Sequence, residues 1–218
     1  GFATILGIAC GRDTRPDVLL IVLDTVRADH LSLYGYPRAT TPALEAFAQD
    51  AVVYRMAIAP DTWTGPSHAS MFTGLLPSQH GVGYVGAPHS DMGVHALDAE
   101  VPVLAERFRD AGYRTAAFVG NEGYLDPVFG LSRGFDRYQR KGMLPAANLV
   151  AMVGPWLRRR QGHSVFVFLN VMDAHEPYAA LPPYDTMFPG RMDGLPPRPV
   201  PGVVPDAATA AHCRSLLQ

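Results

Sequence analysis

Two stretches of the chain are almost continuously apolar, and an acidic residue closes each of them. Residues 17–24 end in Asp24, and residues 164–171 run on to Asp173. Because polar residues do not interrupt residues 17–24, this stretch predicts a strand buried on both faces. Residues 164–171 predict a second, strongly apolar strand. Two shorter apolar segments, residues 113–119 and 52–57, predict further strands.

The segments between these strands show helical spacing of hydrophobic residues. A helix is predicted to open at Thr41, with Pro42 in its first turn, and others are predicted near residues 66–74, 101–108 and 149–157. The inner face of the first helix is assigned to Leu44, Phe47, Ala48 and Ala51. Strands that alternate with helices predict an α/β fold of three layers, with a mostly parallel sheet and helices on both faces.

Composition narrows the class of protein. Hydrophobic residues make up 48% of the 218 residues and charged residues 17%, which favours a buried core over disorder. The formal net charge of -2 argues against a nucleic-acid partner. The one basic run, residues 158–160, is interpreted as the end of a helix. Nine of the 20 prolines lie in residues 177–205, which predicts a long irregular segment.

The N-terminal residues suggest a targeting signal. Residues 2–9 are small and apolar and lead directly into Cys10, like the end of a bacterial lipoprotein signal peptide. The alternative is an apolar strand with a chance cysteine. We therefore divide the chain into residues 1–14, a possible signal remnant or linker, and a domain over residues 15–218. A lipid anchor at Cys10 would place the protein in the bacterial cell envelope or periplasm.

Three candidate functional groups are expected at one edge of the sheet, where the strands end. Ligands of open parallel sheets bind beyond the carboxyl ends of the strands, which is where Asp24 and Asp173 lie, and Thr64 precedes a helix. The Asp24 carboxylate suits a hard divalent cation, although a turn carboxylate is the alternative. The Thr64 hydroxyl can attack an anion bound at the helix start, or it can be a turn hydroxyl. His175 can protonate a leaving oxygen, or it is a loop histidine.

An ordered series of short motifs resembles the sulfatase family, within the alkaline phosphatase superfamily. The match extends over roughly residues 15–190, and so many ordered motifs are more specific than any one of them. The motifs are residues 16–24, 27–36, 40–44, 66–70, 73–74, 80–82, 111–115, 134–136 and 173–178.

The resemblance implies roles for individual residues. It makes Asp24 a metal ligand and Thr64 the nucleophile, at a position where sulfatases convert a cysteine or serine to formylglycine. Thr25 stands where the family has a second acidic ligand, His68 replaces an arginine, and Asn121 replaces a lysine. The resulting predictions are three catalytic residues (Thr64, His68 and His175), two substrate-binding residues (Asn121 and Asp173) and three metal ligands (Asp24, Thr25 and Thr64). The cofactor implied is a divalent ion: calcium, manganese or zinc.

A threonine nucleophile changes the expected chemistry. A formylglycine diol can expel sulfate by re-forming its carbonyl, whereas a Thr64 ester must be cleaved by a second attack at phosphorus or sulfur. The resemblance therefore implies a metal-dependent hydrolase of sulfuric, phosphoric or phosphonic esters on small molecules, glycans or lipids. The alternatives are a phosphoethanolamine- or phosphoglycerol-type transferase and a non-catalytic envelope lipoprotein. Since the family's other metal ligands lie in a later segment, we expect a domain incomplete on its C-terminal side, with weak metal binding and little activity by itself.

Overall fold

The computed structural model describes residues 14–84, 94–160, 162–177 and 180–187. The lipid anchor predicted at Cys10 lies outside these residues, as does most of the proline-rich segment. The chain divides into two compact units, residues 1–176 and 177–218. In the second unit, the described residues form turns without helix or strand. Among the described residues, no helix has the length and apolar character needed to cross a membrane.

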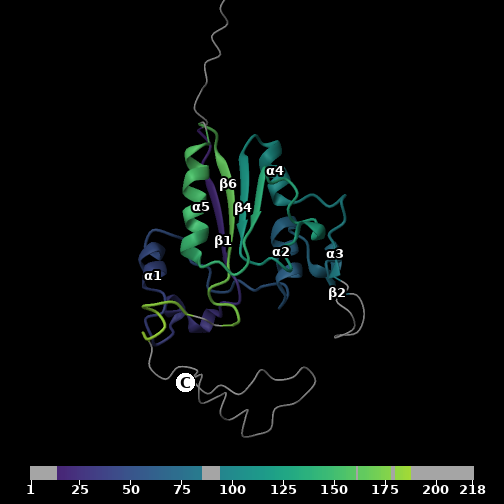
Figure 1. The fold of residues 1–218 in the computed structure, drawn as a ribbon. Coiled ribbons are helices and arrows are strands. Elements are labelled where there is room, and N and C mark those ends of the chain that lie inside the picture. The colour runs from purple at the N-terminus through teal and green to yellow at the C-terminus, as the bar shows by residue number, and fades with distance from the viewer. Residues whose placement is uncertain (1–13, 85–93, 161, 178–179, 188–218) are drawn as a thin grey trace, which may run out of the picture. The chain divides into compact units, whose positions relative to one another are not determined.

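Four parallel strands form the main sheet of the first unit. Their order is β1 (Val18–Leu23), β6 (Val165–Val171), β4 (Arg114–Val119) and β5 (Arg137–Arg140). Figure 1 shows β1, β6 and β4 side by side in it. Val18 pairs with Phe166 and Leu23 with Val171, so the carboxyl ends of β1 and β6 meet at one edge. A small antiparallel pair, β2 (Gly83–Tyr84) and β3 (Val94–His95), lies apart from this sheet.

Helices cover both faces of the sheet (Figure 1). Helix α5 (Ala146–Arg158) lies on one face, and α2 (Thr64–Thr73) and α4 (Leu104–Asp110) lie on the other. The shorter helices are α1 (Pro42–Ala48), α3 (Pro77–His80) and three 3-10 turns at Ala28–His30, Ser32–Tyr34 and Pro127–Phe129. The predicted three-layer, mostly parallel α/β fold is confirmed.

Each face of the sheet has its own hydrophobic core. On the α2 side, Phe168 is fully buried and meets Phe72 edge-on at a centroid distance of 5.0 Å. On the α5 side, Leu149, Val153 and Trp156 are buried against β4 and β6. The hydrophobic residues whose helical spacing was noted in residues 149–157 are thus the face of α5 that packs against the sheet.

Strand β1 differs from the prediction because it lies at the edge of the sheet that the described strands form. Only alternate residues of β1 are covered, and Leu19, Ile21 and Leu23 are 56%, 51% and 43% exposed. Helix α5 packs over β6 and β4 and leaves these three side chains uncovered. The prediction of burial on both faces is wrong for β1, whereas all seven residues of β6 are buried.

Two further predictions from the hydrophobic pattern are wrong. Residues 52–57 form no strand, and Val52 and Met56 are 81% and 84% exposed, because none of the described strands pairs with this segment. Helix α1 forms where expected but buries no residue, and Phe47 on its apolar face is 73% exposed. An apolar pattern records a preference for burial, whereas burial itself requires a neighbouring element.

His80 ties α3 into the core as a neutral side chain. Its Nδ1 accepts a hydrogen bond from the Val82 N–H at 3.0 Å, which leaves the proton of the neutral ring on Nε2, 2.9 Å from the Ser70 hydroxyl. Burial lowers the pKa of His80 below its ordinary value, although nearby backbone carbonyl groups and Asp61 act in the opposite direction. These contacts indicate a structural role for His80.

We expect the stability of the fold to decrease in mild acid because of His80. Its pKa is about 6.5 in an unfolded chain and lower in the folded one, so the unfolded state binds more protons below about pH 6.5. The stabilising contribution is complete above that pH and is lost as the pH falls toward the folded-state pKa. Urea unfolding between pH 5 and 8 should show this dependence reduced in His80→Gln, and an unchanged pH dependence in His80→Gln would contradict the assignment. The exposed His95 supplies a matched His95→Gln control.

Candidate active site

Thr64 is the first residue of α2. The preceding Trp63 is extended, and the helix closes at Gly74, whose φ of 74° is the left-handed conformation that glycine adopts readily. The sequence predicted a helix from Pro66; the structure begins it two residues earlier, with Pro66 still in the first turn. Buried Ala69 and Phe72 hold the helix against the sheet. The Thr64 hydroxyl is thereby fixed at the positive end of the helix, where anions are favoured.

Asp24 lies next to Thr64 at the end of β1. The Asp24 N–H donates to the Val171 carbonyl at 2.9 Å, so the hydrogen bonding between β1 and β6 extends to Asp24. Its carboxylate is 8% exposed, and Oδ2 accepts from the Thr64 hydroxyl at 3.4 Å. Residues 40 positions apart in the chain are therefore in contact at the predicted edge.

Asn121 approaches the same hydroxyl from the end of β4. Its side-chain Nδ2 donates to Thr64 Oγ1 at 3.4 Å, and its Oδ1 accepts from the Tyr124 N–H at 3.0 Å, so the orientation of the amide is fixed. The preceding Gly120 has no room for a side chain, because a Cβ there would lie 2.8 Å from Met172 Cγ. The structure thus brings together Asp24, Thr64 and Asn121.

Asn170 is a residue of this site that the sequence reasoning missed. It is fully buried in β6; its Nδ2 donates to Asp24 Oδ2 at 3.2 Å, and its Oδ1 accepts from the Asn121 N–H at 3.0 Å. One side chain therefore positions both Asp24 and Asn121. The signal was available in the sequence, since Asn170 is the one polar residue in the otherwise apolar strand 165–171.

Thr25 adopts an unusual backbone conformation. Its φ of 59° lies in the left-handed region, which is costly for a β-branched residue by roughly 1–3 kcal/mol. Its hydroxyl donates to the Ala174 carbonyl at 2.9 Å, which ties the end of β1 to the loop after β6. In this arrangement the Thr25 hydroxyl is engaged with the backbone, and its predicted role as a metal ligand stays a prediction.

His68 lies one turn along α2, beneath Thr64. Its ring packs edge-on against Phe72 and Phe168, and its Nδ1–H donates to the Thr64 carbonyl at 2.7 Å. Burial lowers the pKa of His68, outweighing the Thr64 carbonyl and the Asp24 carboxylate, which both raise it. The imidazole is therefore neutral, and its Nε2 is a buried acceptor without a hydrogen-bond partner among the described residues. His68 touches the backbone of Thr64 and not its hydroxyl, which fits a positioning role.

Asp173 and His175 follow β6 but make other contacts. Both carboxylate oxygens of Asp173 accept from the Ala146 N–H, at 2.9 and 3.2 Å, so this acid binds the first turn of α5. His175 Nδ1 donates to the Glu176 carbonyl at 2.8 Å, so Nδ1 is engaged with the backbone of the next residue. No hydrogen bond joins either side chain to Thr64 among the described residues, and their predicted roles stay predictions.

The donors at this edge suit a hard divalent cation. The Asp24 carboxylate uses Oδ2 for both of its hydrogen bonds, and Oδ1 accepts none from the described residues. The Thr64 hydroxyl lies beside it, and carboxylate and hydroxyl oxygens are ligands for such ions. Within the described ranges, however, no three His, Cys, Asp or Glu side chains gather around one point. Asp24 and Thr64 would therefore form only part of a ligand set.

The comparison with protein families agrees with this geometry. The family model named Sulfatase matches residues 16–197. The chain belongs to the sulfatase family. An N-acetylgalactosamine-6-sulfatase from Canis lupus familiaris is 28% identical over 138 residues, which cover 60% of this chain and 26% of the relative. The chain spans about a quarter of the length of curated relatives such as this one.

Solved structures share the fold of this sulfatase-family chain. A phosphonate monoester hydrolase of Agrobacterium radiobacter superimposes with a TM-score of 0.65 and 24% identity, over 81% of this chain and 44% of the other. The C-terminal periplasmic domain of a phosphoethanolamine transferase from Campylobacter jejuni gives a TM-score of 0.51 and 18% identity, over 75% of this chain and 47% of the other. The alkaline phosphatase-like fold expected from the motifs is confirmed.

Proposed function

We propose that this chain carries the nucleophile of a metal-dependent ester hydrolase that cleaves phosphodiester or phosphonate esters through Thr64. The observation that supports the proposal is that a carboxylate and an amide both contact the Thr64 hydroxyl oxygen at the start of a helix. Thr64 Oγ1 lies at the start of α2, 3.4 Å from both Asp24 Oδ2 and Asn121 Nδ2. A hydroxyl at a helix start, beside a carboxylate and an amide donor, is suited to attack a tetrahedral anion.

The proposed reaction has two displacements. Thr64 Oγ1 releases its proton to solvent and forms a bond to phosphorus, the bond from phosphorus to the alcohol oxygen breaks, and His175 supplies the proton that the departing alkoxide takes. Water then attacks phosphorus and gives a proton back to His175, the bond from phosphorus to Thr64 breaks, and Thr64 Oγ1 regains a proton from solvent, which restores the hydroxyl. The Asn121 amide, fixed by Tyr124, donates to the Thr64 oxygen or to the phosphoryl group in this sequence.

A divalent cation would be held by Asp24 and Thr64, with Thr25 as a further predicted ligand. When bound, such an ion lowers the pKa of a hydroxyl and stabilises developing negative charge. Asn170 would hold Asp24 in place through its 3.2 Å hydrogen bond, in the manner of the outer partners that orient metal ligands. Calcium, manganese and zinc are the candidates.

The choice of a phosphorus ester over a sulfate ester rests on Thr64, and the charge of the site bears only on the choice among phosphorus esters. The residue cannot become formylglycine, so the carbonyl re-formation that releases sulfate is not open to it. The neutral His68 and the Asn121 amide also stand where other sulfatases have permanent cations. A site with fewer positive charges disfavours the dianion of a phosphate monoester relative to the monoanions of phosphodiesters and phosphonate monoesters.

A substrate panel tests the proposed function. Full-length protein, with each of the three metals, should hydrolyse bis(p-nitrophenyl) phosphate and p-nitrophenyl phenylphosphonate with a kcat/KM at least about tenfold above that for p-nitrophenyl sulfate or phosphate. A tenfold preference corresponds to about 1.4 kcal/mol in the transition state. A clear preference for the aryl sulfate would contradict the proposal.

A phosphoethanolamine-type transferase is the second candidate, because the Campylobacter jejuni domain shares the fold. It would use the same Thr64 attack and replace water by an acceptor hydroxyl in the second displacement. Addition of lipid or glycan acceptors to the panel distinguishes the two: acceleration with transfer of the group indicates a transferase. Either activity fits our proposal of the bacterial envelope or periplasm as the location. A protein without turnover under all these conditions would instead fit the non-catalytic alternative.

A further inference from the structure

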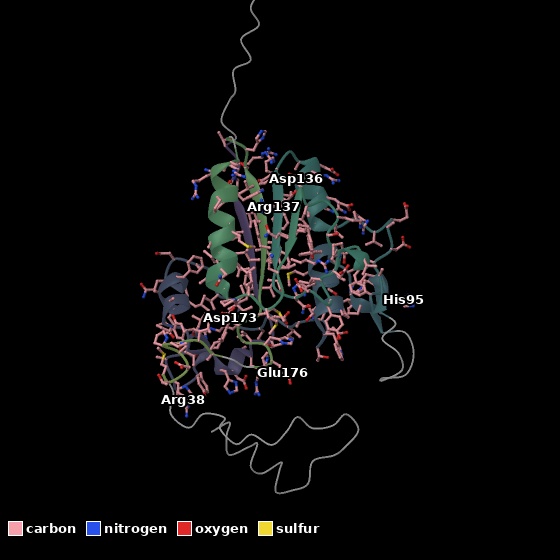
Figure 2. The ribbon with its side chains drawn as sticks, viewed as in Figure 1. Arg38, His95, Asp136, Arg137, Asp173 and Glu176 are labelled. Atoms are coloured by element: carbon pink, nitrogen blue, oxygen red, sulfur yellow. The ribbon has the colours of Figure 1, made fainter. Side chains whose placement is uncertain are left out.

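A cavity of about 240 Å³ lies at the end of the sheet opposite to Thr64. It is formed where β4 and β5 begin and α5 ends, so three separate elements contribute to it. Figure 2 shows Asp136 and Arg137 at this end and Asp173 at the other. The lining residues are Arg114, Asp136, Arg137, Trp156, Arg159 and Arg160.

The positive charge of this cavity exceeds its negative charge. Arg114 lies 3.5 Å from Asp136, and Arg160 pairs with Asp17 outside the lining. Among the described residues, the guanidinium of Arg137 hydrogen-bonds only to the neutral Gln139 amide oxygen, at 3.1 Å through Nε, and it lies over the Phe118 ring.

Arg159 makes no hydrogen bond or ion pair through its side chain in the part of the chain that the structure describes. Two of the four guanidinium groups, those of Arg137 and Arg159, therefore have no carboxylate partner among the described residues.

The electrostatics of the helix explain only part of this cluster. Basic residues at the C-terminal end of a helix interact favourably with its dipole, which accounts for residues 158–160 at the end of α5. Arg114 and Arg137 are the first residues of β4 and β5. The helix dipole does not explain why these two arginines lie beside the basic residues at the end of α5. Converging like charges repel one another, and a bound anion relieves that repulsion.

We propose that this cavity binds a phosphate or sulfate group, at a site separate from the catalytic edge. The planar guanidinium fork matches the oxygens of such groups in pairs, better than a lysine would. The nearly buried Trp156 supplies a rigid apolar wall. The volume of about 240 Å³ is below the range of about 300–1,000 Å³ typical of pockets for drug-sized ligands, which favours a small anionic group.

Calorimetric titration of full-length protein with inorganic phosphate and with sulfate tests the proposal. The double variant Arg137→Gln/Arg159→Gln should bind each anion at least about tenfold more weakly at this site. Arg158→Gln is the control, because it removes one positive charge from the end of α5 without lining the cavity; its matched partner in charge is the single variant Arg159→Gln. The affinity of Arg158→Gln should stay within about twofold of the wild type. Equal binding by the double variant and the control would overturn the proposal.

Vesicles distinguish the source of the anionic group. Phosphatidylcholine vesicles with and without phosphatidylglycerol are sedimented with the same three proteins. Loss of binding to the anionic vesicles in the double variant indicates a lipid headgroup, whereas loss only of free phosphate or sulfate binding indicates a soluble ligand; both support the site. If neither changes, the proposal is wrong. The single variant Arg159→Gln keeps the test valid if the double variant unfolds, since the Arg159 side chain is exposed.

Discussion

Replacement of Thr64 by alanine should reduce turnover by on the order of 10³-fold or more while the protein stays folded. The substitution removes the oxygen that lies 3.4 Å from both Asp24 and Asn121. Both hydrogen bonds of this half-buried hydroxyl are long, so their loss should cost less than about 1 kcal/mol of stability. Initial rates on the best substrate of the panel, together with thermal unfolding, measure the two effects.

Two further measurements isolate the nucleophile. Thr64→Ser keeps a hydroxyl at the same position and should retain activity within about tenfold, because only a methyl group is lost. Metal affinity of Thr64→Ala should change far less than its turnover, since the Asp24 carboxylate remains. Near-normal turnover of Thr64→Ala would remove Thr64 from the mechanism and leave the fold assignment untouched.

Replacement of Asp24 by asparagine should remove most of the metal affinity of the full-length protein. The amide has the shape of the carboxylate and can still accept from Asn170, so the change is mainly one of charge. Substitution of outer partners of a metal ligand commonly costs about 10–100-fold in affinity, so loss of the ligand charge itself should cost at least about 100-fold. Activity at limiting metal should fall in parallel. Competition titration with a metal indicator gives the affinity directly.

Asp29→Asn is the control for Asp24→Asn. Asp29 is an exposed carboxylate five positions further along the chain, and the bond from Arg27 lowers its pKa to about 2, so it is ionised at neutral pH like a free surface acid. Its removal should leave metal affinity and turnover unchanged. If Asp24→Asn behaved like this control, Asp24 would not be a metal ligand.

The sequence predicted the fold correctly mainly where the hydrophobic pattern of an element agreed with the burial of that element in the structure. Strand β6 is apolar throughout and is buried throughout, and the spacing of Leu149, Val153 and Trp156 matches the stripe of α5 that packs on the sheet. Strand β1 has the same kind of sequence and is half exposed. The difference lies in which strands flank each of them, and that order depends on contacts far apart along the chain.

The sequence predicted where the site lies, at the carboxyl edge of the sheet, but it predicted less well which side chains contact one another there. The ends of parallel strands meet at one edge, so Asp24 and Thr64 were expected to meet there, and they do. The same rule placed Asp173 at this edge, but its carboxylate binds the N-terminus of α5, because the loop after β6 turns toward that helix. His68 was matched by its position in a motif, whereas its burial and its neutral ring follow from the packing of Phe72 and Phe168 around it.

The sequence by itself determined the class of fold, the family, and a carboxylate and a hydroxyl at the carboxyl edge, because these follow from local periodicity and from the order of short motifs. Only the tertiary structure decided that β1 is an edge strand, that Asn170 joins Asp24 to Asn121, and that four arginines from three elements surround one cavity. The physical reason is that a side chain's partners are set by strand order and by loop direction. Both result from packing between residues that are distant in the chain.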